Sequence, residues 1–545
     1  MKIQNDIQMK NLKKEILSMG AAFFTLFSGM MVSCSDSASD HYKVSPEVAG
    51  RTNLWELISQ QPELSVFAGL IASASYDRIL SSEQSYTVWA PENEALTGID
   101  PNDSVAVRRL VSNHVARYEY PASAEVANIP VIYMLSAKKM RFSRTGDAYS
   151  MHGVELAKKN LAAKNGILHT LKKQLAFEPS LWQYMESAEY DSIRSYMYSF
   201  TKWEFSRSAS KPVDYNEEGM IVYDSVFFET NPLWYVYTGA RGVGWLNNED
   251  SIYTMIVPDN KAWIEAYNRN FDYYKPDPTI ENPDSAQNTN TCYSIVQDLV
   301  FRGEINPASY GRDTLFSTRF TPFLDPVRLF SGNNSVRVSN GWVYPSSHMN
   351  DELYESCIKP IKVEAEMAVG RWHSEAQDFG RIRSLRVQDV PDVSSGGYLE
   401  VLPVSSSVTP SVSFELPNVL AAEYDIYCVL LAQSYVENIK DTTQYITRLR
   451  FEIQQWDRVT DKARSEAWKT VQLFMDETTS RYLTQGKGIS NISVTEKFQF
   501  PFANYNEPEN VFRIKVSSVP SSADRRNPLV IREMRIDYVY LEASR

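Results

Sequence analysis

The sequence predicts a multidomain chain in which two α+β domains precede an all-β sandwich of the jelly-roll type. Three observations support this fold class. The chain has 545 residues, about three times the length of a typical domain. A block of about thirteen residues occurs twice, at 84–96 and at 251–263. From about Val363 onward, apolar residues alternate with polar ones, which is the pattern of half-buried strands.

The N-terminus predicts a secretory signal peptide over residues 1–33. Lys10, Lys13 and Lys14 precede an apolar run at 16–32. This run is short and is interrupted by serine and glycine, so it fits a signal peptide better than a membrane-spanning helix. It ends directly before Cys34, where signal peptidase cleavage is expected.

The last residues of this run, Met31-Val32-Ser33-Cys34, resemble a bacterial lipobox, with Met31 where leucine is usual. The resemblance implies that Cys34 is acylated and anchors the mature chain to a membrane. Residues 34–50 predict a flexible tether, because the first of them are polar, acidic or small. An acidic stretch in this place resembles the surface-export signal of Bacteroidetes lipoproteins. That implies display on the outer face of the outer membrane, with the periplasmic face as the alternative.

The charge balance argues against nucleic acid as a partner. The formal net charge is −12, and the sequence shows no basic stripe of the kind that binds phosphate. The acidic excess mainly favours solubility.

The remaining cysteines and the histidines do not predict a metal site. Cys292, Cys357 and Cys428 are an odd number without CxxC spacing, and the six histidines are scattered. We therefore expect no metal and no cofactor. Two states of the thiols stay open: a Cys292–Cys357 bridge and buried free cysteines.

The first folded segment begins near residue 51 with helical signals. Asn53 and Glu56 have the spacing of a capping box, and apolar residues recur at helical spacing over 54–58 and 67–71. Residues 85–96 predict a strand that ends at a proline and is followed by a helix. Further on, Asn165-Gly166 predicts a turn before a strand.

These blocks, in this order, resemble the fasciclin domain. Residues 87–96 read Thr-Val-Trp-Ala-Pro-Glu-Asn-Glu-Ala-Leu and are similar to the family's first conserved block. Residues 165–169, Asn-Gly-Ile-Leu-His, are similar to its second. The family's central Tyr-His pair is Asn113-His114 here, so the tyrosine is lost. The resemblance implies an adhesion or interaction module over 51–178, not an enzyme.

Both blocks recur later in the chain. Residues 251–263 align with 84–96, and Ser339 to Tyr344 align with the Asn-Gly block. A period this long indicates duplication of a domain rather than a solenoid. We therefore expect a second, degenerate fasciclin-like domain over 179–364, with insertions that include the polar stretch at 275–290.

Two histidines fall in these blocks. His114 follows Leu110 by four positions and Val111 by three, which places it on the apolar face of a helix. His169 lies in the strand-like second block, and the second copy lacks both histidines. We expect buried core histidines, so no catalytic residue is predicted.

The region 365–545 predicts the jelly-roll sandwich. Five segments alternate with period two, and turn-rich pieces separate them. These segments are 412–416, 424–430, 449–453, 512–516 and 534–540. The two ends of the region, 363–366 and 536–541, resemble galactose-binding-like jelly rolls, the fold of many carbohydrate-binding modules.

That resemblance points to four aromatic side chains that would stack on sugar rings if they are exposed: Trp372, Tyr398, Trp456 and Trp468. The alternative is that they pack in the core or at strand edges. No pair of carboxylates stands out as an acid/base set for glycoside cleavage.

The resemblances together imply a lipid-anchored surface protein that binds or adheres, with a glycan or a peptide as the ligand. Lipoproteins of this kind accompany SusC/SusD-type nutrient importers in Bacteroidetes, so an accessory role in glycan or nutrient uptake is expected. Two alternatives stay open: a structural adhesin with protein partners only, and a polysaccharide hydrolase within the jelly roll.

Overall fold

The computed structural model describes residues 51–544 in two compact units, the first of which ends at Ser180 and the second of which begins at Leu181. Within 51–544 it leaves out 209, 216–220, 225, 237–240, 312–313, 333, 373–379, 388–389, 391, 406–407, 437–442, 457–467, 475–481 and 506–511. Cys34 and the tether predicted over 34–50 lie outside the described residues.

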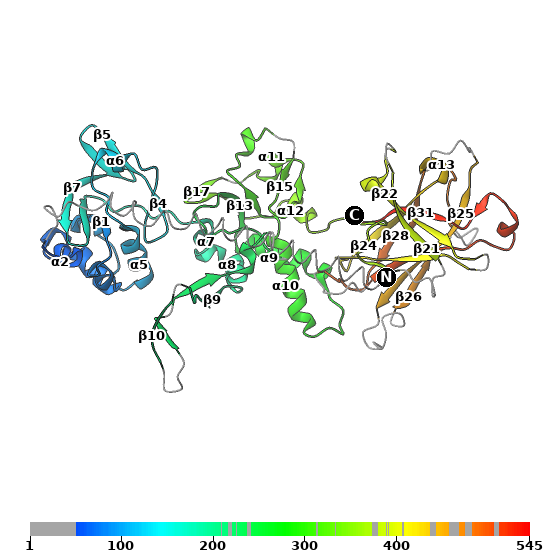
Figure 1. Cartoon of the computed structure of the whole chain (residues 1–545), viewed down its shortest axis with the longest axis horizontal. Coiled ribbons are helices and arrows are strands. Elements are labelled where there is room, and N and C mark those ends of the chain that lie inside the picture. The colour runs from blue at the N-terminus through cyan, green and yellow to red at the C-terminus, as the bar shows by residue number, and fades with distance from the viewer. Residues whose placement is uncertain are drawn as a thin grey trace, which may run out of the picture. The chain divides into compact units, whose positions relative to one another are not determined.

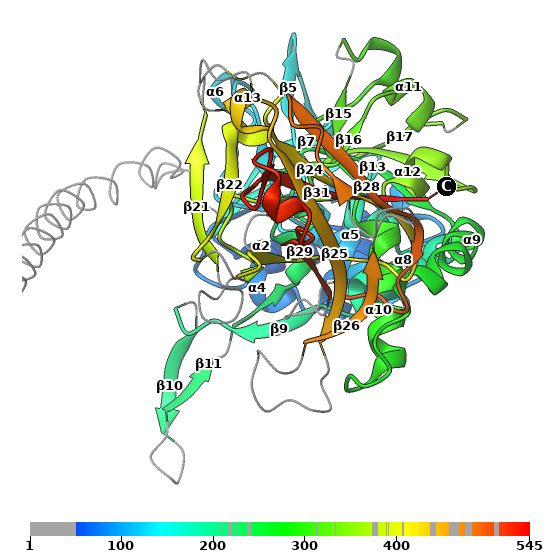
Figure 2. The same cartoon turned by 90° about the vertical axis from the view of Figure 1, so that its right-hand side faces the viewer.

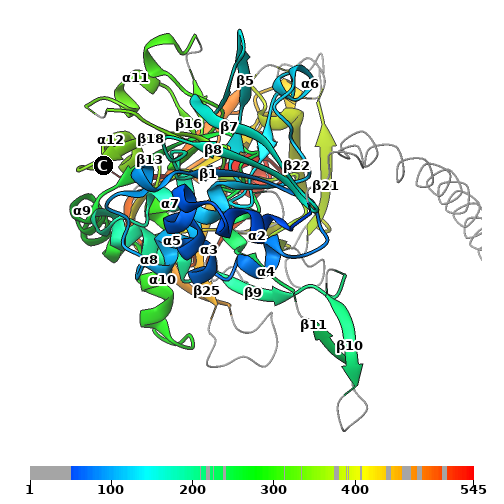
Figure 3. The same cartoon turned by 90° about the vertical axis from the view of Figure 1, so that its left-hand side faces the viewer.

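The first unit begins with short helices that cover one face of a sheet (Figure 3). Asn53 caps the first of them, because its side chain accepts from the Glu56 amide while the Glu56 carboxylate accepts from the Asn53 amide. The predicted capping box is therefore confirmed. The helices are α2 (Leu54–Ser59), α3 (Ser65–Ser73), α4 (Asp77–Leu80), α5 (Ser104–Asn113) and, further along, α6 (Ala124–Ala127).

The sheet of this unit has the order β2-β1-β8-β7-β6-β5. Strands β1 and β8 run parallel at its centre and are buried along their whole length, whereas the other neighbours are antiparallel. The strands are β1 (Tyr86–Pro91), β2 (Val115–Arg117), β5 (Phe142–Thr145), β6 (Ala148–Met151), β7 (Val154–Ala163) and β8 (Gly166–Leu171), beside the small pair β3 (Ile132–Tyr133) and β4 (Lys139–Met140). The residues predicted to form a helix after Pro91 form only a 3₁₀ turn, Asn93–Leu96.

Asn165 joins the helices to this sheet. Its Oδ1 accepts from the Leu54 amide at 2.8 Å, and its Nδ2 donates to the carbonyls of Leu80 and Ser82 at 2.9 and 2.7 Å. The side chain is 5% exposed, so these bonds replace water that cannot reach it. We call these three bonds the asparagine clamp.

Gly166, the next residue, allows the two central strands to approach. It has φ +147°, and a Cβ at this position would lie 1.8 Å from the Tyr86 carbonyl oxygen. No other residue fits such a contact. The Asn-Gly pair therefore does more than form the predicted turn, because it sets where β1 and β8 meet.

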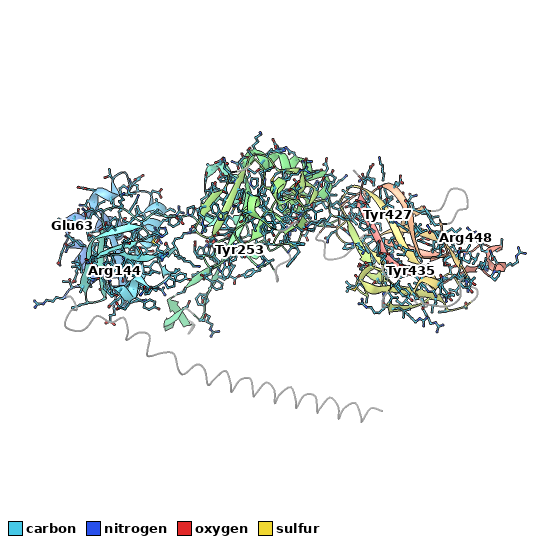
Figure 4. The ribbon with its side chains drawn as sticks, turned by 90° about the horizontal axis from the view of Figure 1, so that it is seen from above. Glu63, Arg144, Tyr253, Tyr427, Tyr435 and Arg448 are labelled. Atoms are coloured by element: carbon cyan, nitrogen blue, oxygen red, sulfur yellow. The ribbon has the colours of Figure 1, made fainter. Side chains whose placement is uncertain are left out.

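The second unit begins with a domain that repeats this arrangement. Its main sheet has the order β14-β13-β18-β17, and β13 pairs with β18 in parallel in the same register as β1 with β8. Asn340 forms a second asparagine clamp: its Oδ1 accepts from the Leu181 amide at 2.8 Å, and its Nδ2 donates to the carbonyls of Leu246 and Asn248. Gly341 lies against the carbonyl of Tyr253, which Figure 4 labels, as Gly166 lies against that of Tyr86.

The elements of this domain include longer helices and a projecting pair of hairpin segments (Figure 1). The helices are α7 (Leu181–Tyr184), α8 (Asp191–Tyr198), α9 (Asn260–Asn270), α10 (Pro283–Val296), α11 (Pro326–Leu329) and α12 (Asp351–Glu355). The strands are β9 (Lys202–Phe205), β10 (Lys211–Tyr215), β11 (Ile221–Asp224), β12 (Phe227–Thr230), β13 (Tyr253–Pro258), β14 (Val300–Arg302), β15 (Leu315–Phe316), β16 (Pro322–Phe323), β17 (Val336–Val338) and β18 (Gly341–Ser346). Part of the polar stretch expected as an insertion, 275–290, forms the first half of α10.

The C-terminal region consists of two β-sheets that share one hydrophobic cluster (Figure 2). One sheet has the order β21-β22-β31-β24-β28, with β19 beside β31. The other has the order β20-β23-β29-β25-β26, with β27 and β30 beside β25. All five segments predicted from alternation correspond to strands, β23, β24, β25, β29 and β31, although Leu416 lies one residue beyond the end of β23.

The bounds of these strands are β19 (Ile361–Glu364), β20 (Arg371–Trp372), β21 (Gly380–Arg386), β22 (Gly397–Pro403), β23 (Ser411–Glu415), β24 (Glu423–Leu431), β25 (Ile446–Trp456), β26 (Trp468–Phe474), β27 (Tyr482–Leu483), β28 (Ile489–Gln499), β29 (Phe512–Ser518), β30 (Val530–Ile531) and β31 (Met534–Ala543). One short helix, α13 (Gln433–Val436), follows β24.

Tyr505 links this β region to the preceding domain within the second unit. Its hydroxyl donates to Gln297 at 2.9 Å, its carbonyl accepts from Asn290, and its ring packs edge-on against Tyr274. The backbone amide of Ala503 also donates to the Lys275 carbonyl. Side chains and backbone of both parts therefore form one continuous contact.

The three cysteines downstream of Cys34 are free and buried. Burial raises the pKa of Cys292 to about 11 and that of Cys357 to about 12, and it also raises the pKa of Cys428. Of the two states left open by the sequence, the structure shows free thiols.

We predict that Asn165→Ala destabilises the first unit by about 3 kcal/mol or more, because it leaves buried backbone groups without partners. Asn340→Ala is expected to do the same in the second unit. Urea unfolding of each variant measures this. The control is Asn128→Ala, at an exposed position. Unfolding midpoints equal to that of the control would show that the clamps contribute little.

Candidate functional site

His114 and His169 are fully buried, and each uses both ring nitrogens in hydrogen bonds. His114 Nδ1 lies 2.8 Å from the Leu110 carbonyl, and its Nε2 accepts from the Leu175 amide. His169 Nε2 lies 3.0 Å from the Tyr120 carbonyl, and its Nδ1 accepts from the Asn160 amide. Each ring is therefore a neutral tautomer held by the backbone.

Burial lowers the pKa of both histidines to about 4, against the backbone carbonyls that favour the charged form. Neither ring has a free nitrogen for proton transfer. The prediction that both are core histidines is confirmed.

The aromatic residues predicted from the jelly-roll resemblance are not together on a surface. Tyr398 and Trp456 are 3% and 8% exposed, so their rings are core residues and cannot stack on a sugar. Trp468 is partly buried, packs edge-on against Trp456 at 5.3 Å and lies beneath the guanidinium of Arg513. The side chain of Trp372 lies outside the described residues.

Exposed aromatic side chains lie instead on the two-stranded sheet that β9 forms with β12. Trp203, Phe205 and Phe227 are 67%, 40% and 53% exposed. Phe205 pairs directly with Phe227, and Trp203 with Glu229, so all four side chains lie on one face of the two-stranded sheet. The rings of Phe205 and Phe227 are 5.8 Å apart in an edge-on contact. We call Trp203, Phe205 and Phe227 the aromatic face.

Polar groups border the aromatic face on one side. The Glu229 carboxylate accepts from the Asn247 amide at 3.4 Å, and burial raises its pKa. Trp245 lies two residues before Asn247 in the chain. It is 45% exposed and stacks on the buried Trp234. Exposed rings next to a carboxylate and an amide form a surface that suits a partner with both apolar and hydroxyl groups.

Sequence reasoning missed the aromatic face. The available signal was the alternation in Lys202-Trp203-Glu204-Phe205, which places aromatic residues at every second position. Alternation alone does not tell whether such a face is buried, and here both strands have no further neighbour among the described strands.

Buried carboxylates occur at one end of the C-terminal β region. Asp537 is inaccessible to solvent and accepts from the Ser394 amide at 3.2 Å. Its pKa is raised to about 6, mainly by burial and also by Glu364 and Glu366, against the Ser394 hydrogen bond, which lowers the pKa. In the described part of the chain, no group of three or more His, Cys, Asp or Glu side chains has the arrangement of a metal site.

Helices long and apolar enough to cross a membrane do not occur in the described ranges of the chain.

The family of the first unit follows from its sequence. Residues 62–177 match the family model of the fasciclin domain. The chain contains a fasciclin domain. This domain holds the parallel β1–β8 pair, the clamp residue Asn165 and both buried histidines.

Two curated relatives are similar to part of the chain. Transforming growth factor-beta-induced protein ig-h3 of Sus scrofa is 24% identical over 147 residues, 26% of this chain and 21% of the relative. The protein of that name in Oryctolagus cuniculus is 25% identical over 131 residues, 23% and 19% of the two lengths. The chain thus spans about a fifth of the length of these relatives.

A solved structure of a FAS1 domain pair from the insect cell adhesion molecule fasciclin I also matches. It is 14% identical, with a TM-score of 0.21, over 53% of this chain and 96% of that chain.

We predict that acid destabilises the fasciclin domain through its two histidines. Their pKa of about 4 lies below that of a histidine in an unfolded chain, so the unfolded state binds protons first. The contribution of the two histidines to the free energy of unfolding is fully present above about pH 6.5. It falls as the pH is lowered toward 4, by roughly 3 kcal/mol for each histidine. Urea unfolding at several pH values from 7 to 4 measures the free energy of unfolding. The NMR signals of the two imidazole rings show where each histidine titrates in the folded chain. His114→Gln is the comparison and should reduce this pH dependence. A ring that titrates near pH 6.5 in the folded chain would contradict the prediction.

Proposed function

We propose that the chain is a lipid-anchored protein of the outer membrane that faces the cell surface and binds or adheres to a partner there. In this proposal Cys34 carries the lipid, and the residues after it serve as the tether. The accessory role in a SusC/SusD-type uptake system, with a glycan or nutrient as ligand, is part of the same proposal.

The aromatic face is the observation that carries the binding function. Large apolar side chains rarely stay exposed together on a soluble protein unless something covers them. Trp203 alone is 67% exposed, and Glu229 and Asn247 beside it supply acceptors and donors for hydroxyl groups. A glycan fits this mixture, because a sugar ring has an apolar face and a polar edge.

The fasciclin domain supports an adhesive role. The insect protein whose domain pair was compared above is a cell adhesion molecule, and the resemblance to it in domain type agrees with adhesion here. A purely protein-binding adhesin is the alternative, since Phe205 and Phe227 also suit a protein surface. The less favoured alternative is a polysaccharide hydrolase.

We predict that Trp203→Ala weakens glycan binding by the mature chain about tenfold or more, because it removes the most exposed ring of the face. A glycan array followed by titration of the hits measures this. Phe316→Ala is the matched control, since Phe316 is 53% exposed in the same unit but outside the face.

Three other outcomes would contradict this assignment. Binding lost in Trp468→Ala but kept in Trp203→Ala would move the site to the C-terminal β region. Capture of a protein partner, with no glycan hit, would favour the adhesin. Release of product from a polysaccharide panel would favour the hydrolase.

We also predict that Cys34→Ala abolishes membrane association, because no acyl chain can then be attached. Fractionation of cells into soluble and outer-membrane material tests this. Protease treatment of intact cells tests surface display in the unaltered protein. A Cys34→Ala variant that still sediments with the outer membrane would show that protein contacts hold the chain there.

A further inference from the structure

A cavity of about 240 Å³ lies in the second α+β domain, among helices α9, α10 and α12. Its walls are apolar. Ala266, Ile295, Met349 and Leu353 all line it, and each is at most 7% exposed. An engineered apolar cavity of roughly 150 Å³ takes up benzene, so this one has room for a branched or aromatic side chain.

The rim of the cavity is charged, with both signs present. Glu265 and Arg269 line it and stand one helical turn apart on α9, with side chains 43% and 42% exposed. His348 lies 2.9 Å from the Glu265 carboxylate. The guanidinium of Arg269 lies 3.2 Å from the centre of the Tyr354 ring, and its distance of 3.7 Å to Asp351 is longer than a hydrogen bond.

The fasciclin domain has no counterpart of this rim. In that domain the residues after β1 form a 3₁₀ turn of four residues, Asn93–Leu96, whereas those after β13 form the eleven-residue helix α9. Glu265 and Arg269 lie in the turns of α9 that the first copy lacks. The shared fold therefore does not require the rim, which is a feature of the second copy alone.

We propose that this cavity binds a free α-amino acid with an apolar side chain. The side chain enters the cavity, the ammonium group pairs with Glu265, and the carboxylate pairs with Arg269. The ammonium and carboxylate of an amino acid are attached to one carbon, which suits two opposite charges on one face of a helix. The charge pattern of the rim thus selects a zwitterion over a simple hydrocarbon, anion or cation. This proposal does not depend on the aromatic face.

The test uses residues 35–545, which lack the predicted signal peptide and the proposed lipid-bearing Cys34, with methyl-labelled methionine. Met349 lines the cavity, so its methyl NMR signal reports occupancy. L-leucine and L-phenylalanine are the probes. The comparison ligands are 4-methylpentanoate, which lacks the ammonium group, and 3-methylbutylamine, which lacks the carboxylate. We expect saturable shifts with the amino acids and binding about tenfold weaker or more for each comparison ligand.

Three variants separate the parts of the site. Arg269→Gln is expected to weaken the binding of leucine and of 4-methylpentanoate alike. Glu265→Gln is expected to weaken the binding of leucine and to leave the binding of 4-methylpentanoate unchanged. Ala266→Leu fills the cavity and removes binding of every ligand. The two glutamine substitutions are at surface positions. The test therefore does not depend on whether the Ala266→Leu variant, with its filled cavity, still folds.

Two results would overturn the proposal. One is the absence of any Met349 shift with L-leucine or L-phenylalanine up to about 10 mM. The other is equal binding of the amino acids and their comparison ligands, which would show an apolar cavity without zwitterion recognition.

Discussion

A buried asparagine amide holds each α+β domain together. Asn165 and Asn340 each bond one backbone amide and two backbone carbonyls, all from segments far away in the sequence. The glycine that follows each of them lets the central parallel strands approach to a distance that no side chain permits. Because buried polar groups are costly without partners, each clamp fixes the entering helix against the sheet.

What surrounds the clamps differs between the two copies. The fasciclin domain fills its interior with two neutral histidines and extends its sheet by β6 and β5. These features do not occur among the described residues of the second copy, which has the two-stranded sheet of β9 and β12 and the longer helix α9 instead. Both features that suit a ligand, the aromatic face and the cavity, belong to these additions. The shared centre gives stability, and the additions are available for binding.

The sequence predicted the elements whose pattern is local. The capping box at Asn53, the helices after it and the five alternating strands all have signals within a few residues, and the structure contains them. The burial of His114 followed from helical spacing. The duplication was visible because two blocks occur twice in the sequence. One block is the strand that ends at a proline, β1 or β13, and the other is the Asn-Gly pair of the clamp.

Burial across the fold was harder to predict. Tyr398 and Trp456 lie in strands, as Trp203 and Phe205 do, yet the first two are core residues and the last two are exposed. The difference depends on whether a second sheet covers the strand, and this is a property of tertiary structure. The cavity was not predictable either, because its lining comes from helices α9, α10 and α12, with 80 residues between the end of α9 and the start of α12.

The most direct test of the clamps is hydrogen exchange at two backbone amides, those of Leu54 and Leu181. Each donates to the side chain of a clamp asparagine at 2.8 Å. If the clamps hold the domains together, both amides exchange as slowly as the central strands β1 and β13, through unfolding of the whole domain. Exchange at either amide that is much faster than in those strands would show that the helix opens on its own, and would contradict this account.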